Sequence, residues 1–191
     1  MTINKFLDFL KFSQKFTSTK RAIFALGEDR KENDVEHSYQ LAIVTWYVIE
    51  NEKLKLDTNL AIKYALVHDL EEALFGDIHI FDEKGRKEKE KKEKAARNKI
   101  IKMFPKWSEY KTLSKNYKLL ADEESKLVNG IDKILPVLNI YLDKGRTWKK
   151  EKRSLDDIAE NKRVTTKVHP FTQKLWKEVE NMLIKEKLRL F

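Results

Sequence analysis

The residues best suited to chemistry lie around position 68, where a histidine is followed directly by an aspartate. An apolar run at 65–67 leads into His68 and Asp69, and Glu72 follows them within one helical turn. Imidazole and carboxylate groups both ligate divalent metals, and burying them side by side is costly unless a partner compensates. The segment therefore predicts a metal site, with Glu72 placed to orient or deprotonate a water molecule there.

Two residues elsewhere in the chain could complete the ligand set. His37 opens an earlier apolar segment, and Asp132 lies within a later one. Together with His68 and Asp69 they offer two nitrogens and two carboxylates from three separate predicted helices. Such a set suits one Mn²⁺, Fe²⁺, Co²⁺, Ni²⁺ or Zn²⁺ ion better than Ca²⁺, with Mg²⁺ as a further candidate. An ion held in this way lowers the pKa of water and neutralises charge on a phosphoryl group.

Three further residues of ligand type are not expected to bind the metal. Asp122 is a rival to Asp132, but the acidic residues that follow it indicate the solvated start of a helix. His79 and His169 have no partner at ligand spacing, so we interpret them as structural. His79 follows Asp77 closely, and a contact between His79 and substrate stays open.

The elements that position these residues are predicted to be helices, because apolar side chains recur at helical spacing. Asp34 is a candidate N-cap for the helix that carries His37, and Asp57 or Thr58 for the helix that leads into His68. The second of these is expected to continue until Gly76. The other predicted helices cover 3–15, about 85–104, a short piece at 107–113, 121–142 with Pro136 inside it, and a last helix starting at Pro170. A polar connector is expected at 27–34, a loop with a short helix near 155–159 between 145 and 168, and no β-strand.

Composition favours one all-α domain over residues 1–191. The chain is 41% hydrophobic and 37% charged, and its 5 glycines and 3 prolines are too few for a β-sandwich rich in turns. It has no cysteine, so a thiolate zinc site is excluded. The longest apolar stretches, near 41–49 and 134–142, are too short to span a bilayer. We expect a cytoplasmic protein without a membrane partner.

The formal net charge of +9 is compatible with binding either nucleic acid or a small phosphorylated substrate. Much of the excess lies in the run Lys84–Lys94, where glutamates alternate with lysines. That pattern is typical of a solvated helix face. We therefore do not expect nucleic acid to be the partner.

The candidate residues also form an ordered motif. It reads Glu36-His37-Ser38, then His68-Asp69-x-x-Glu72-x-x-x-Gly76-Asp77, then Asp132-Lys133. The motif resembles the HD-domain superfamily of metal-dependent phosphohydrolases, and most of all its 5'-deoxynucleotidase group and related small HD hydrolases. The resemblance covers roughly residues 5–143 and implies an HD-domain helical bundle.

The resemblance also implies a role for each residue. The metal ligands would be His37, His68, Asp69 and Asp132. Glu72 would activate water, and Asp77 would contact the nucleotide near its sugar as a catalytic and substrate-binding residue. Members of the group remove the 5'-phosphate of deoxynucleoside monophosphates with Co²⁺, Mn²⁺ or similar ions and are commonly dimers. We therefore expect a phosphoric monoester hydrolase with a nucleotide substrate, active as a homodimer.

One departure from the group concerns the residues around the phosphate and sugar. Its deoxynucleotidases carry an Arg-Trp pair ahead of the first histidine, whereas this chain has Lys20-Arg21-Ala22. Arg21 is the expected phosphate ligand, with Arg30 as a second candidate. Discrimination against a 2'-hydroxyl stays open because the tryptophan is missing.

Three other functions compete with this interpretation. Alarmone hydrolases resemble His-Asp-x-x-Glu-Asp, but Ala73 follows Glu72 here. Triphosphohydrolases of dNTPs are usually larger. A non-catalytic nucleotide- or nucleic-acid-binding module is supported by the net charge, but it has no need to keep Glu72 beside a complete ligand set. Removal of the metal by EDTA would abolish the turnover of an enzyme, whereas added salt would lower the affinity of a protein that binds nucleic acid electrostatically.

Overall fold

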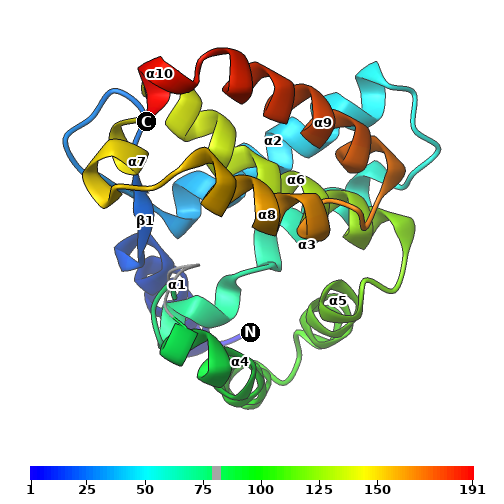
Figure 1. The fold of residues 1–191 in the computed structure, drawn as a ribbon. Helices are drawn as coiled ribbons and strands as arrows, with labels where there is room; N and C mark the ends of the chain where they lie inside the picture. Colours follow the sequence, from blue (N-terminus) through cyan, green and yellow to red (C-terminus); the bar gives the residue numbers. More distant parts are fainter. Residues whose placement is uncertain (79–82) are drawn as a thin grey trace.

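The computed structural model describes residues 1–78 and 83–191, and helices account for most of them (Figure 1). The all-α prediction is confirmed. The α-helices are α1 (Ile3–Ser18), α2 (Asp34–Asn51), α3 (Thr58–Val67), α4 (Glu83–Met103), α5 (Ser108–Leu119), α6 (Glu123–Leu142), α7 (Arg146–Glu151), α8 (Leu155–Thr165), α9 (Pro170–Lys185) and α10 (Lys187–Leu190). No described helix is both long and apolar enough to cross a membrane.

A small β-hairpin corrects the prediction that the chain has no strand and only a connector at 27–34. Strands β1 (Lys20–Phe24) and β2 (Lys31–Asn33) pair antiparallel, with Lys20 opposite Asn33. The turn between them contains Gly27 in the left-handed region (φ +74°). Strands this short carry too few residues to show the alternation by which a strand is recognised in a sequence. The hairpin brings β1 beside the start of α2.

The helices around the motif begin largely as predicted. Asp57 caps α3, accepting a hydrogen bond from the Leu60 amide at 3.1 Å. Helix α2 starts at Asp34, but its cap is Asn33, which forms a capping box with Glu36. Local side-chain chemistry thus fixes where both helices start.

The prediction of one helix continuing from 58 to Gly76 is wrong. Helix α3 ends at Val67, and a short 3₁₀ helix, η1 (Leu70–Leu74), follows. His68 and Asp69 lie in the turn between them. The ring nitrogen Nδ1 of His68 donates to the Ala65 carbonyl at 2.9 Å, near the point where the helix ends. Gly76, at φ +84°, closes the segment as expected.

The short helix predicted near 155–159 is confirmed and is longer than expected, since α8 runs to Thr165. The segment 145–168 is otherwise more ordered than predicted, because α7 occupies part of the expected loop. Ser154 and Asp157 form a capping box at the start of α8, and Trp148 of α7 is buried. The predicted start of the last helix at Pro170 is confirmed.

Helix α6 lies at the centre of the fold and contributes to both apolar cores (Figure 1). Its first half packs with α2, α3 and α5 through Leu127 and Val128. Its second half packs with α7, α8 and α9, where Trp148 and Trp176 are buried. Trp46, by contrast, is 49% exposed. Asp132 lies on α6 between the two cores.

Gly145 allows a stability test of the junction between α6 and α7. Its φ of +75° is left-handed, and a Cβ there would overlap the Leu190 carbonyl oxygen. Gly27 has a similar φ of +74°, but a Cβ added to it would meet no atom within 4 Å. We expect Gly27→Ala to lower the free energy of unfolding by about 1–2 kcal/mol through backbone strain. Gly145→Ala should cost a further ~1–3 kcal/mol from overlap. Urea unfolding of both variants measures the difference, and equal losses would contradict the packing at Leu190.

Candidate metal site and cleft

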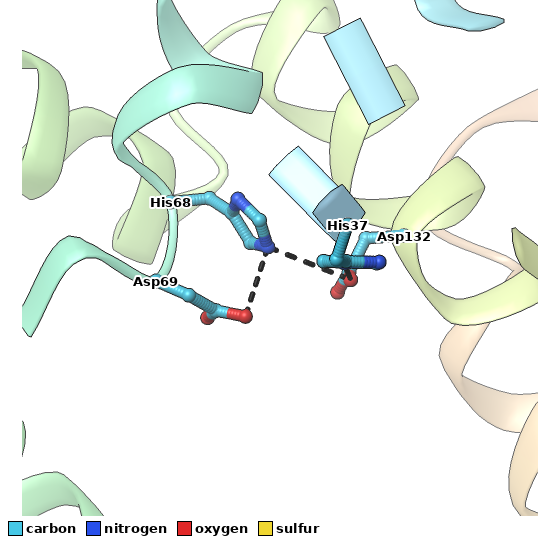
Figure 2. A group of neighbouring side chains, drawn as sticks. All are labelled: His37, His68, Asp69 and Asp132. Carbon is cyan, nitrogen blue, oxygen red and sulfur yellow. Dashed lines mark hydrogen bonds and ion pairs between the residues drawn. The ribbon is translucent and has the colours of Figure 1, made fainter. Parts of the chain in front are cut away.

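The structure brings all four predicted ligands together (Figure 2). One ligand atom from each of His37, His68, Asp69 and Asp132 lies within 4.8 Å of the others. His37 Nε2 is 2.9 Å from Asp132 Oδ1. His68 Nε2 is 2.9 Å from Asp69 Oδ2 and 3.6 Å from Asp132 Oδ1. Helices α2 and α6 and the turn after α3 therefore meet at one point.

The arrangement of donors fits a divalent cation. Because a carbonyl oxygen only accepts, the bond to Ala65 places the proton of neutral His68 on Nδ1 and turns the lone pair of Nε2 toward the cluster. That Nε2 atom is buried beside the carboxylate oxygens of Asp69 and Asp132, which cannot donate a hydrogen bond to its lone pair. Two imidazoles and two carboxylates that converge around it form an oxygen and nitrogen set for a transition metal. The cluster could hold one divalent ion.

The charges of the cluster also favour a cation at its centre. Burial lowers the pKa of His68, but Asp69 and Asp132 outweigh it and raise that pKa to about 10. His37 behaves differently, because burial and the nearby Arg21 lower its pKa to about 4. The carboxylates thus stabilise positive charge beside His68, and a bound metal would displace that proton.

Arg21 lies beside the cluster with its nitrogens engaged by carboxylates. Nη1 is 3.2 Å from Asp34 Oδ1 and 3.4 Å from Asp69 Oδ2, and Nε is 3.2 Å from Glu32 Oε2. Burial opposes its charge, but the surrounding aspartates raise the pKa of Arg21 overall. The guanidinium therefore orients Asp69. Arg30, the second candidate, instead pairs with Glu28 and Glu36 on the exposed hairpin.

Asp34 and Glu32 are carboxylates whose role the sequence did not indicate. Both are buried next to Arg21, and burial raises each pKa to about 7 despite the arginine. The sequence predicts Asp34 only as a helix cap. Its contact with Arg21 on β1 depends on the hairpin, which brings that strand beside the start of α2.

Glu72 is buried in η1 and forms an ion pair with the charged helix α4. Its Oε1 lies 2.8 Å from Lys89 Nζ, which is also 3.7 Å from Glu93. Burial, followed by repulsion from Asp69, raises the pKa of Glu72 to about 9. The solvated face predicted for 84–94 therefore needs correction at Lys89, whose side chain reaches into the interior.

A cavity of about 550 Å³ opens beside the cluster. His68, Asp69 and Asp132 contribute to its wall, as do Asp77 and Lys89. Lys133 also lines it, with Nζ 2.5 Å from Asp132 Oδ2. The two lysines place positive charge where an anionic substrate would approach. Lys133 could have been suspected from its place next to Asp132, whereas Lys89 could not.

The residues that were not expected to be metal ligands lie outside the four-residue cluster. Asp122 caps α6 and accepts a hydrogen bond from the Tyr64 hydroxyl at 2.6 Å. His169 caps α9 through the Phe171 amide, in keeping with a structural role. His79 lies outside the described residues.

A sequence model described as "HD domain" matches residues 13–176 of the chain. A curated relative, the 5'-deoxynucleotidase HDDC2 of Mus musculus, is 29% identical over 119 residues, which are 58% of this chain and 55% of that protein. The protein of the same name from Dictyostelium discoideum is 29% identical over 154 residues, 73% of this chain and 77% of the relative. The chain thus spans little more than half the length of the mouse relative.

A solved structure shows the same fold. A protein from Magnetospirillum magnetotacticum MS-1, described as a "predicted metal-dependent phosphohydrolase", superimposes with a TM-score of 0.81. The superposition covers 96% of this chain and 95% of that one at 19% identity. Because the two sequences are only 19% identical, the similarity supports a shared fold and nothing further.

Proposed function

Because the chain belongs to the HD domain family, we propose that it is a metal-dependent phosphohydrolase that removes the 5'-phosphate of (deoxy)nucleoside monophosphates. The observation that carries the proposal is the cluster of buried His37, His68 and Asp132 with partly exposed Asp69, which opens on a cavity. A volume of about 550 Å³ is in the range of small-molecule sites. The names of the curated relatives support the substrate class.

We assign the four residues of the cluster as ligands of one divalent transition metal ion, with Co²⁺, Mn²⁺, Fe²⁺, Ni²⁺ and Zn²⁺ as candidates and Mg²⁺ as a further one. When bound, such an ion lowers the pKa of water and neutralises phosphoryl charge. In its ionised form Glu72, held by Lys89, accepts a proton from the attacking water. Arg21 and Lys133 add positive charge for the phosphate, and Asp77 accepts a hydrogen bond from the sugar.

The remaining features of the proposal concern the whole protein. Residues 1–191 form one domain, since α6 contributes to both cores. A homodimer is supported by large side chains exposed on α2, among them Tyr39, Ile43 and Trp46. The protein acts in the cytoplasm, in keeping with a ligand set that uses no cysteine.

Phosphate release from a panel of 5'-monophosphates, deoxy and ribo, tests this function. Protein stripped of metal should be inactive, and Co²⁺, Mn²⁺ or Mg²⁺ should restore turnover. The ratio of the deoxy to the ribo rates then gives the sugar preference. EDTA should abolish the activity again. Failure with every monophosphate under all three metals would reject the proposal, and the same panel repeated with dNTPs and alarmones would identify the alternatives. Binding to nucleic acid that falls steeply with salt, without turnover, would indicate a binding module instead.

A further inference from the structure

His37 has one ring nitrogen inside the metal cluster and one outside it. Nε2 lies 2.9 Å from Asp132 Oδ1 and belongs to the cluster. Nδ1, on the other side of the ring, is buried and forms no hydrogen bond with any described residue. The carboxylate beside it is that of Glu32 on β2, whose Oε2 atom is 4.0 Å away. Histidines that bind a metal usually donate their second ring N–H to such an acceptor, which fixes the direction of the ring.

The carboxylate of Glu32 is buried and held in place by its neighbours. Asn139 Nδ2 on α6 donates to Glu32 Oε1 at 3.3 Å. The amide of Asn139 also forms two reciprocal hydrogen bonds with Gln40 on α2, of 2.7 Å and 3.1 Å. Oε2 is 3.2 Å from Arg21 Nε, but this N–H is not directed at the oxygen, so Oε2 has an ion pair and no hydrogen bond among the described residues. Oε2 is therefore an acceptor held beside His37.

The tautomer of His37 decides whether this acceptor can be used. A neutral imidazole carries one proton on one of its two nitrogens. The contact with Asp132 Oδ1 places that proton on Nε2, because an ionised carboxylate only accepts, and Nδ1 then turns a lone pair toward Glu32. Coordination of a metal by Nε2 needs the opposite tautomer, with the proton on Nδ1. A shift of about 1 Å would bring Nδ1 and Oε2 to hydrogen-bond distance.

We propose that Glu32 is a positioning residue for the metal: its Oε2 accepts the Nδ1 proton of His37, which leaves the lone pair of Nε2 directed at the ion. The inference rests on the proposed function and adds a residue outside the four-ligand cluster. The imidazole stays neutral throughout, as metal binding requires, because the proton of Nε2 is lost and one is held on Nδ1. Asn139 and Gln40 support Glu32 from α6 and α2, the helices that carry Asp132 and His37.

Glu32→Gln tests this contact with almost no change of shape. The carbonyl oxygen of the new amide should keep the bond from Asn139, so that its NH2 group faces Nδ1 and favours the wrong tautomer. Calorimetric titration of metal-free protein with Zn²⁺ should show an affinity about 10–100-fold below that of wild type. Asp34→Asn is the matched control, because Asp34 is also a buried carboxylate but pairs with Arg21 and not with His37. It should lose less affinity, and equal losses in the two variants would overturn the inference.

Nitrogen chemical shifts of isotope-labelled histidine report the tautomer directly, and a change in folding stability alone would not alter them. In wild-type protein, His37 should carry its proton on Nε2 without metal and on Nδ1 when Zn²⁺ is bound. Coordination through Nδ1, or a proton that stays on Nε2 in the loaded protein, would overturn the inference and leave the metal site standing. Wild-type protein that binds no Zn²⁺ would reject the metal site of the proposed function, and this inference with it.

Discussion

His68→Ala is expected to abolish metal binding and phosphate release together. The substitution removes one of two nitrogens from the cluster, together with the imidazole that contacts both Asp69 and Asp132. Loss of a partner that merely orients a metal ligand costs roughly 10–100-fold in affinity, and loss of the ligand itself should exceed this. Metal content after dialysis against Mn²⁺, together with phosphate release, measures both effects.

The matched control uses a histidine outside the cluster. His169 caps α9, and His169→Asn keeps a side chain that is a good helix cap. This variant should retain the metal and the full rate. If His68→Ala bound Mn²⁺ as tightly as the control, His68 would not be a ligand, and the assignment of the cluster would be wrong.

Glu72→Gln is expected to keep the metal and lose about 10²–10⁴-fold in kcat. Glutamine has nearly the same shape and its carbonyl still accepts from Lys89, so the fold and the position of the Lys89 side chain should change little. It cannot accept a proton from water. Glu72 lies outside the four-residue cluster, and metal content should therefore equal that of wild type. Parallel measurements of kcat and metal content separate this result from that of His68→Ala.

Glu71→Gln is the control for the structural part of this effect. Glu71 is the adjacent buried carboxylate, and it pairs with Arg97 at 2.9 Å much as Glu72 pairs with Lys89. Both variants weaken one buried ion pair and should lose similar stability, but only the Glu72 variant should lose most of its kcat. Metal-dependent turnover that survives in Glu72→Gln would exclude Glu72 as the proton acceptor.

Arg21 illustrates how a residue found in the sequence can have an altered role in the structure. The sequence predicts it as a phosphate ligand, and it does lie beside the cluster. Its contacts with Asp34, Glu32 and Asp69 mean that it also fixes the carboxylates around the metal site. A phosphate would have to share the guanidinium with them.

The local starts and stops of the helices and the identity of the cluster could be predicted from the amino-acid sequence. Asp57 and Pro170 mark helix starts, and Gly76 a stop, because capping and left-handed turns depend on one or two neighbouring residues. Residue type and order alone indicate the four candidate ligands. The hairpin at 20–33 and helices α7 and α8 could not be predicted in full, because short elements contain too little periodicity.

The contacts that these residues make depend on the packing of segments that are distant in the chain. His37, His68 and Asp132 are far apart in sequence, and the crossing of α2 and α6 beside the end of α3 brings them within ligand distance. Lys89 belongs to a run that reads as solvent-exposed, yet it pairs with buried Glu72 because α4 packs against η1. Local rules reach about four residues along a helix, whereas packing between helices sets these contacts.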